Sequence, residues 1–550
     1  MNAPVPALGV GARRWWALGA VMLAVLAVGL DATVLSVAIP TLATQLHASE
    51  SDLQWFSSGY LLVLAALMLP AGLLGDRIGR KRVMAGALLL FGIASVACAL
   101  SKTPTEFLAA RVLLGFAGAP LIVMAISALA VLFSEEERPK AVGIWASVNF
   151  ISLPIGPILG GYILTHAWWG WVFLMNAPVA LLGLLAVVLL VPETRASRAP
   201  GLDPIGVGSS TAGLVGLTYG LIQAGQEGWG SVNAIVPMAA GLLLLLGFFR
   251  WEAVLGRRPG GQPLVDLALF RSRSFTWGVV LLAVSGVAMI GGLFTLPQYF
   301  QGIQGVDPMG SGFRLLPLIA GLIVGAIPGS RLAVRLGPKL VIATGFAIFG
   351  IGCLIGANMT LASGTAFTAS WMAVVGVGLG LVFAPAASAA LSQMDAERSG
   401  VASGVLQALN KTGGPLGAAL FGSALSSVYQ AHLPMAGLPA AAVATMRSGL
   451  AQGLAVARQL DSPTLTRGVQ NAFVHGMNAA LLCSVAIAGV GLLLTLAFMP
   501  MRTAARTVTP DGGATRSSPA PGPGGAEGAA PGLTPLATGR IVAASAEPVE

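Results

Sequence analysis

Charged side chains are scarce in this sequence, because Lys, Arg, Asp and Glu together make up 9% of its 550 residues. Soluble domains carry roughly 25% of these residues. Hydrophobic residues, in contrast, make up 55% of the chain. A globular fold in water cannot bury so large an apolar fraction. We therefore expect lipid to be the solvent for most of this protein.

Cysteine and histidine are also rare, with three and four copies. The cysteines lie in separate apolar stretches, which predicts neither a disulfide framework nor a metal site. No G-x-x-x-x-G-K-[ST] phosphate loop is present, so ATP is not the expected energy source. No nucleophile is paired with a base or a metal in the pattern of an enzyme, and we predict no catalytic site, no metal and no cofactor.

Long apolar stretches make up much of the sequence. A span needs roughly 20 apolar residues to cross about 30 Å of hydrocarbon, and over such a length only a helix satisfies its own backbone in lipid. These two rules predict an all-α integral membrane protein with fourteen transmembrane helices. Their centres fall near residues 27, 63, 92, 120, 152, 181, 214, 242, 286, 323, 348, 378, 414 and 488.

The Lys and Arg residues concentrate in alternate connections between these stretches, beginning with Arg13 and Arg14 before the first one. Positive loops favour the cytoplasm. The alternation predicts an even number of spans, with both termini cytoplasmic. It also accounts for the net charge of +9 without nucleic acid, for which the sequence has no recognisable motif.

The densest group of charges is the turn AGLLGDRIGRKRV, residues 71–83, between the second and third spans. One interpretation is a simple topology anchor. The order of residues indicates more, because Gly72, Gly75 and Gly79 allow a sharp turn. Asp76 is one carboxylate among four cations and can pair locally or cap a helix.

In this turn, the order Gly72-Leu-Leu-Gly-Asp76-Arg77-Ile-Gly79-Arg80-Lys81 resembles the signature loop of the major facilitator superfamily. Further motifs resemble its fourteen-helix drug:proton antiporters over about residues 15–500. The departures are Ser36, Leu114, Gly170 and Asn410, where that family usually has Asn, Gln, Arg and Arg. The matching motifs are Leu30-Asp31-Ala-Thr33 to Pro40, Arg111-Val-Leu-Leu-Gly115, Gly156-Pro157-Ile-Leu-Gly160-Gly161, Trp169 to Pro178, and Leu202-Asp203.

The resemblance implies two six-helix bundles that alternate in access, with two inserted helices between them. A degenerate repeat supports two related halves, because Ser330–Lys339 aligns with the signature loop and places Val334 opposite Asp76. The implied parts are a cytoplasmic tail 1–14, a first bundle 15–192, inserted helices 193–252, a second bundle 253–503 with a long outer loop 428–472, and a disordered cytoplasmic tail 504–550.

The resemblance also implies a conformational role for the signature loop residues Gly72, Asp76, Arg77, Gly79, Arg80 and Lys81. Asp76 should meet the start of the thirteenth span across the cytoplasmic seam and hold the outward-facing state. The second loop has Val334 instead of a carboxylate. We therefore expect this locking to be one-sided.

Asp31, Arg111 and Lys411 are the only charges predicted to lie deep in lipid, where charges are expensive and usually functional. Asp31 precedes Pro40 by about nine residues, or roughly 14 Å of helix, and Arg111 starts the fourth span at a similar depth. The two side chains could therefore meet. An apolar environment favours a neutral carboxyl group and a nearby arginine favours a carboxylate. Asp31 and Arg111 are thus either a proton switch or a permanent salt bridge that fixes two helices.

The fifth span carries Pro154, Gly156, Pro157, Gly160 and Gly161. Proline bends a helix and glycine lets a neighbouring helix pack closely, so mere helix packing is one interpretation. In the family this antiporter motif is associated with exporters, where it is thought to seal a leak. The resemblance therefore implies export.

Lys411, next to Asn410 in the thirteenth span, needs a cavity, a partner or water around its ammonium group. It either attracts an anionic or zwitterionic substrate or pairs with Asp31 or a carbonyl group. Tyr60 and Phe294 are candidates for the wall of an apolar substrate cavity, with interface anchoring or helix packing as the alternative.

Together these observations predict a proton-coupled antiporter in the plasma membrane that exports small amphipathic compounds such as drugs, antibiotics or related metabolites. Its expected partners are the substrate, protons and the lipid bilayer, and we expect it to work as a monomer. The alternatives are an importer or uniporter of the same fold, and a non-transporting membrane sensor.

Overall fold

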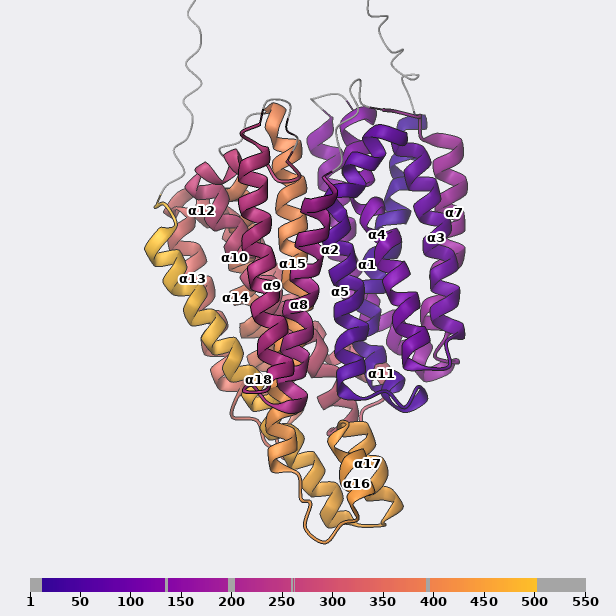
Figure 1. Cartoon of the computed structure of the whole chain (residues 1–550), viewed down its shortest axis with the longest axis vertical. Helices are drawn as coiled ribbons and strands as arrows, with labels where there is room; N and C mark the ends of the chain where they lie inside the picture. Colours follow the sequence, from indigo (N-terminus) through magenta and orange to yellow (C-terminus); the bar gives the residue numbers. More distant parts are fainter. Residues whose placement is uncertain are drawn as a thin grey trace, which may run out of the picture. The chain divides into compact units, whose positions relative to one another are not determined.

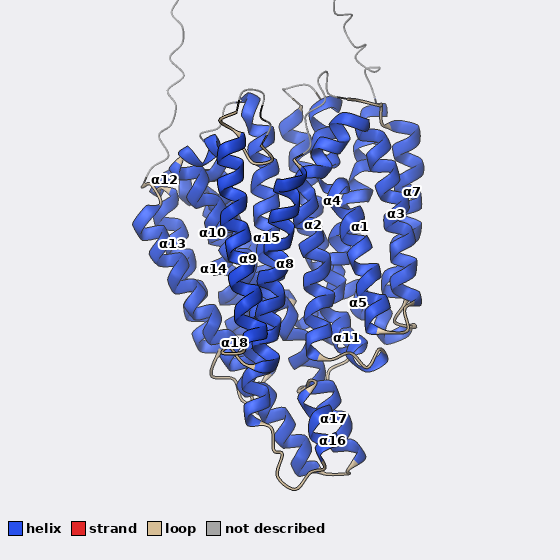
Figure 2. Cartoon of the chain, in the orientation of Figure 1, coloured by secondary structure: helices blue, strands red, loops and turns tan. Residues whose placement is uncertain are grey.

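The fold is helical throughout the part of the chain that the structure describes (Figure 2). A computed structural model describes residues 12–133, 137–195, 203–258, 261, 263–391 and 396–501. No strand occurs among these residues. The predicted tail 504–550 lies wholly outside these residues, and only residues 12–14 of the predicted tail 1–14 lie among them.

The helices run along one another in a bundle (Figure 1). The residue ranges of sixteen of these helices are, in chain order, α1 Ala12–Gln45, α2 Glu50–Ile78, α3 Arg80–Leu100, α4 Pro104–Leu132, α5 Arg138–His166, α6 Trp171–Leu174, α7 Asn176–Leu190, α8 Pro204–Glu227, α9 Val232–Leu255, α10 Arg273–Gly302, α11 Pro308–Arg314, α12 Leu316–Leu336, α13 Pro338–Gly356, α14 Thr365–Leu391, α15 Ala396–His432 and α18 Pro463–Phe498.

Each of the fourteen predicted span centres lies within one of these helices. Within the described residues, twelve helical segments are long and apolar enough to cross a membrane. The helices α5 and α15 are not among the twelve, although they have 29 and 37 residues. The all-helical membrane fold is confirmed, and the count of fourteen spans stays a prediction.

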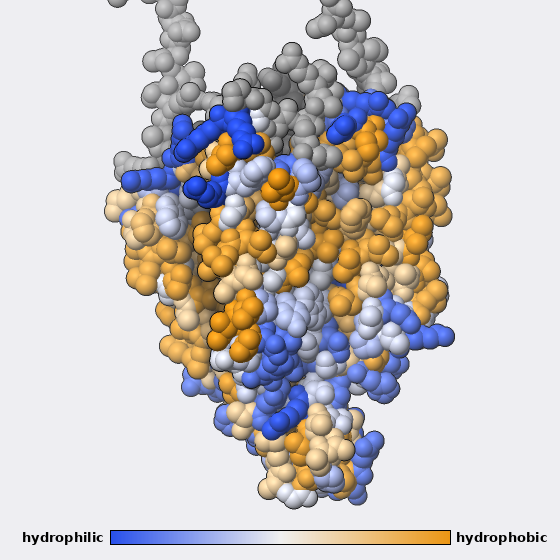
Figure 3. Space-filling view, viewed as in Figure 1, coloured by the Kyte–Doolittle hydropathy of each residue, from blue (hydrophilic) through white to orange (hydrophobic). Residues whose placement is uncertain are grey.

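Lipid contact explains why much of the apolar surface is exposed. In α9 the four buried residues are Ala234, Gly241, Phe248 and Glu252, whose spacing keeps them on one face of the helix. The remaining faces carry exposed side chains such as Val232 and Leu243. Figure 3 shows hydrophobic residues in a broad zone between hydrophilic residues at the two ends. This pattern is the one expected of helices that face hydrocarbon.

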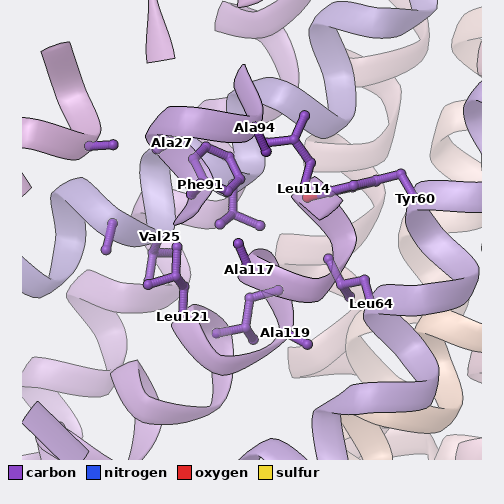
Figure 4. Close-up of a cluster of buried hydrophobic side chains, with 14 of the residues drawn as sticks. Val25, Ala27, Tyr60, Leu64, Phe91, Ala94, Leu114, Ala117, Ala119 and Leu121 are labelled. Atoms are coloured by element: carbon purple, nitrogen blue, oxygen red, sulfur yellow. The ribbon is translucent and has the colours of Figure 1, made fainter. Parts of the chain in front are cut away.

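The buried hydrophobic side chains form two clusters. One lies almost wholly within residues 17–191 and the other mostly within residues 248–499. Figure 4 shows part of the first cluster, where Tyr60 and Leu64 of α2 approach Leu114 of α4. We refer below to the first half and the second half of the protein for these two packed regions, while the exact domain boundaries stay predictions.

The segment 428–472, predicted as a long outer loop, is largely helical. Helix α15 continues to His432, α18 begins at Pro463, and two short helices, α16 (Ala440–Arg447) and α17 (Leu450–Gln459), lie between them. At 8 and 10 residues they are too short to cross a bilayer. The hydroxyl of Tyr429 ties α15 to this segment by donating to the carbonyl oxygens of Met446 and Gly449.

The helices α16 and α17 project from the end of the bundle opposite to the start of α1 and the end of α18 (Figure 1). We call this end, which also includes α11 and the turn before α2, the outer end. The charge pattern predicts that it lies outside the cell, and this orientation stays a prediction.

Candidate functional site

A buried ion pair joins α1 and α4. One guanidinium nitrogen of Arg111 lies 2.6 Å from Oδ2 of Asp31, and neither side chain is exposed at all. Charges of opposite sign at this distance offset part of the large cost of removing both from water. The structure therefore brings together the two residues that helix depth alone placed at the same level.

Three further groups complete the surroundings of this pair. Asn176, the first residue of α7, donates from Nδ2 to Oδ1 of Asp31 over 3.3 Å. Arg111 Nε donates to the carbonyl oxygen of Phe56 over 3.3 Å. The guanidinium carbon of Arg111 lies 4.3 Å from the centre of the Tyr60 ring, within the range of a cation–π contact. Asn176 belongs to a matched motif, but its sequence position alone did not indicate a place beside Asp31.

A small cavity adjoins the ion pair between the two halves. It has a volume of about 30 Å³, and Arg111, Tyr60, Ser36 and Phe294 are among the residues that line it. This volume is enough for a water molecule. The second guanidinium NH₂ of Arg111 and the hydroxyl of Tyr60 are buried and make no hydrogen bond to the described protein. Tyr60 of α2 and Phe294 of α10, which were predicted as cavity walls, thus line the same cavity.

At the other end of α2, the signature loop makes a tight turn into α3. Gly79 has φ +123°, a conformation that side chains with a Cβ rarely adopt. Across this turn Asp76 Oδ1 accepts from Nε and one NH₂ of Arg80, at 3.0 and 2.8 Å. The turn is thus held by an ion pair between residues that sequence reasoning grouped together.

Two further residues of the loop contact Glu193, which follows α7. The backbone N–H of Lys81 donates to Oε1 of Glu193 over 3.3 Å, and Arg82 Nε lies 3.5 Å from Oε2 of the same residue. Arg77 is exposed. Residues 392–395, just before α15, lie outside the described residues, so the expected contact of Asp76 with that region stays a prediction.

The antiporter motif packs α5 against both halves. A Cβ added at Gly160 would lie 3.1 Å from a methyl group of Val34 in α1, and one added at Gly161 would lie 2.7 Å from Cα of Met309 in α11. Gly156 faces Thr33, and Pro157 faces Gly312. Thr165 Oγ1, one turn beyond Gly161, donates to Oδ2 of Asp307 over 3.3 Å. The motif therefore closes the seam at the outer end, while Pro154 lies one turn further inward.

Lys411 lies in the middle part of α15 and is partly buried. No ion pair of the described residues includes it, and Asp31 already pairs with Arg111. Its neighbour Asn410 packs against Gly286 of α10: a Cβ added at Gly286 would lie 3.2 Å from the carbonyl oxygen of Asn410. The structure thus does not bring Lys411 to the carboxylate that sequence reasoning offered as its partner.

Comparisons with known proteins agree with this architecture. The sequence profile of the Major Facilitator Superfamily matches residues 21–418. The chain is 34% identical to the tetracenomycin C resistance and export protein of Streptomyces glaucescens, over 90% of this chain and 93% of that protein. It is 30% identical to the multidrug efflux pump LfrA of Mycolicibacterium smegmatis, over 87% and 96%.

Another similar protein is the methyl viologen resistance protein SmvA of Salmonella typhimurium, at 32% identity over 88% of this chain and 97% of that protein. Among solved structures, a bacterial homologue of the human lysosomal transporter Spinster, inward-facing and occupied, superimposes with a TM-score of 0.68. It covers 89% of this chain and 97% of the other at 14% identity, which supports the fold alone. The helical membrane architecture, the matched profile and the relatives that share nearly the full length show that this chain belongs to the Major Facilitator Superfamily of transporters.

Proposed function

We propose that this protein is a proton-driven exporter of small amphipathic compounds in the plasma membrane, with both termini in the cytoplasm. The relatives named above are export, efflux and resistance proteins. The observation that carries the energetic part of the proposal is the fully buried Asp31–Arg111 pair beside a cavity between the two halves.

Protonation of Asp31 would change the energy of this site. A neutral Asp31 leaves the Arg111 guanidinium as an uncompensated charge in an apolar surrounding, which costs several kcal/mol. Movement of the two halves that admits water to the cavity would relieve this cost. Loss of the proton restores the ion pair and the closed cavity, so gain and loss of one proton at Asp31 can drive the alternation of access.

The other motifs have supporting roles in this proposal. Close packing of Gly161 against α11 across the seam, and of Gly160 against Val34 of α1, keeps protons from leaking past the outer end. Asp76 and Arg80 hold the turn that must shift when the cytoplasmic side opens. Tyr60 and Phe294 line part of the path of an apolar substrate, and Lys411 with Asn410 favours an anionic or zwitterionic group on it.

Purified protein in liposomes tests this proposal directly. With a pH gradient as the only energy source, we expect a panel of amphipathic compounds to contain some that the protein moves uphill, against the flow of protons. Asp31→Asn should abolish uphill movement, whereas Asp461→Asn, at an exposed carboxyl group near the end of α17, should leave it unchanged.

The alternatives give different results in the same liposomes. Movement of the compound in the direction of the protons would indicate an importer, and movement that ignores the gradient would indicate a uniporter. No movement of any compound by protein that remains folded would favour a sensor. Uphill export by Asp31→Asn on a pH gradient alone would overturn the role of Asp31.

A further inference from the structure

Another buried carboxyl group lies at the outer end, away from Asp31. Glu50, the first residue of α2, is 2% exposed. Its backbone N–H donates to the carbonyl oxygen of Ser448 over 2.6 Å. Its Oε1 accepts from Nε2 of Gln298 in α10 over 3.3 Å. Glu50 therefore lies where the first half meets both α10 and the α16–α17 segment.

Unlike Asp31, Glu50 has no cationic partner, because no ion pair of the described residues includes it. The titratable groups on the surrounding elements are otherwise engaged or exposed. Asp52 of the same helix accepts from the N–H and hydroxyl of Ser49. Tyr429 of α15 donates to carbonyl oxygens of the α16–α17 segment.

Three cationic or titratable side chains remain near this region. Arg458 of α17 lines the same cavity as Glu50, Arg447 of α16 is directed to the sulfur of Met435, and His47 in the turn before α2 is exposed. An ionised Glu50 would thus be buried with one amide donor and no paired cation. Such burial is unfavourable, whereas a protonated carboxyl group is neutral.

Glu50 also borders a cavity through which water can reach it. This cavity has a volume of about 140 Å³, room for several water molecules. Residues of both halves line it, among them Thr44 and Leu53 of the first half and Gln301 and Gln452 of the second. Gln301 and Gln452 also cross the seam, because they donate to the carbonyl oxygens of Val37 and Ala43 at 2.9 and 3.4 Å. Opening this seam would expose Glu50 to the outer solution.

We propose that Glu50 is a second proton-binding site, at the outer end, and that it must bind a proton from the outer solution before this end can close. This inference rests on the proposed alternation of access. The proton is released to the same side when the outer end reopens. Glu50 therefore sets the dependence of closure on external pH and adds no proton to the transport stoichiometry.

Cysteine labelling from outside tests the proposal. Ala43→Cys is a suitable reporter because Ala43 is 4% exposed and lines the cavity, and Cys483, which is partly exposed, is replaced by alanine. An impermeant maleimide is applied between about pH 5 and pH 9. Labelling at Ala441→Cys, an exposed position in α16, corrects for ionisation of the thiol itself.

With Glu50 present, we expect corrected labelling of the reporter to rise severalfold as the external pH rises. With Glu50→Gln, which is neutral at every pH, labelling should stay low throughout, and Glu50→Asp should restore the dependence. Asp461→Asn, which keeps a residue tolerant of the φ of +45° at that position, should behave like the unchanged protein. An unaltered pH dependence in Glu50→Gln would overturn the proposal.

Gln298→Leu provides a second test that leaves the carboxyl group in place. An amide that donates to a carboxylate favours the charged form. Its removal should move the midpoint of labelling to higher pH, and an unmoved midpoint would contradict the role of Glu50. Asp31→Asn separates this site from the transport proposal: loss of uphill transport with retained pH-dependent labelling supports both sites, whereas loss of pH-dependent labelling in Asp31→Asn alone assigns it to Asp31.

Discussion

The two halves of this protein share a turn but differ in the chemistry that they bury. Gly79 and Gly337 end the aligned helices α2 and α12 with φ of +123° and +90°. Across the first turn, Asp76 pairs with Arg80, whereas Val334, at the position aligned with Asp76, is 87% exposed. The two turns therefore share a backbone geometry, but only the first turn contains a carboxylate.

The same asymmetry appears inside the membrane. In the first half Arg111 is fully buried and paired with Asp31, while in the second half Lys411 has no ion-pair partner among the described residues. A buried charge is tolerated when it is paired, or when it faces a polar cavity. In the proposed mechanism, the first half therefore carries the proton chemistry and the second half supplies surfaces that move against it.

The largest effect should follow from unpairing the buried charges of the first half. Arg111→Met leaves Asp31 without its cation, and we expect a loss of about 3–5 kcal/mol of stability together with loss of proton-driven transport. Thermal unfolding in detergent and liposome transport measure the two effects. Lys411→Met is the matched control in the second half and should not lower the melting temperature, because it breaks no ion pair.

The double variant Asp31→Asn, Arg111→Met sharpens this prediction. It removes both charges, so we expect much of the lost stability to return while transport stays absent. A double variant as unstable as Arg111→Met alone would show that packing, and not charge pairing, explains the loss.

A smaller effect is expected where the two halves touch, at Gly161. In Gly161→Ala the new Cβ would approach Cα of Met309 within 2.7 Å, closer than such atoms pack, so the seam at the outer end must widen. We expect a measurable proton leak into liposomes that hold the variant. Gly86→Ala, where nothing lies within 4 Å of an added Cβ, should leave proton permeability unchanged. A Gly161→Ala variant that shows no proton leak would argue against a seal at this position.

The turns themselves should have a modest influence. Partly exposed ion pairs contribute about 0.2–1 kcal/mol, so Asp76→Asn should shift the balance of conformations by up to about fivefold toward the inward-open form. Val334→Asp adds a carboxylate to the second turn and should shift the balance the other way. Accessibility of cysteines placed on the cytoplasmic side of the cavity reports both shifts, and equal labelling in all three proteins would remove the loop from the conformational mechanism.

The smallest effect is expected at Lys411, whose charge acts on a subset of substrates. Lys411→Gln should weaken export of anionic and zwitterionic compounds by several-fold and leave neutral compounds unaffected. Export profiles over a panel sorted by charge test this expectation. If no anionic compound is affected, Lys411 does not attract the substrate.

Much of the fold could be predicted because lipid imposes a simple rule on sequence. Every predicted span centre lies in a helix, since a long apolar stretch has no other way to satisfy its backbone in hydrocarbon. The segment 428–472 was harder, because α16 and α17 are short and contact other protein elements. Their helical structure depends on packing that no periodicity of 8 or 10 residues reveals.

The site was predictable to the extent that depth in a helix follows from counting residues. Asp31 and Arg111 occupy the same level and do pair. Counting could not show that Asn176 reaches the same carboxylate, because α7 is far away in sequence. Glu50 was missed for a similar reason, since beside Asp52 at a helix start it reads as an exposed capping residue.

The sequence by itself determined that the chain is a helical membrane protein and which stretches form its long helices, because the cost of polar groups in lipid acts on each segment separately. Only the tertiary structure decided which charges are paired, which lie beside a cavity, and that Glu50 is buried at the outer end without an ion-pair partner among the described residues. Those properties arise where several helices meet, and distances between helices are not encoded in the composition of any one of them.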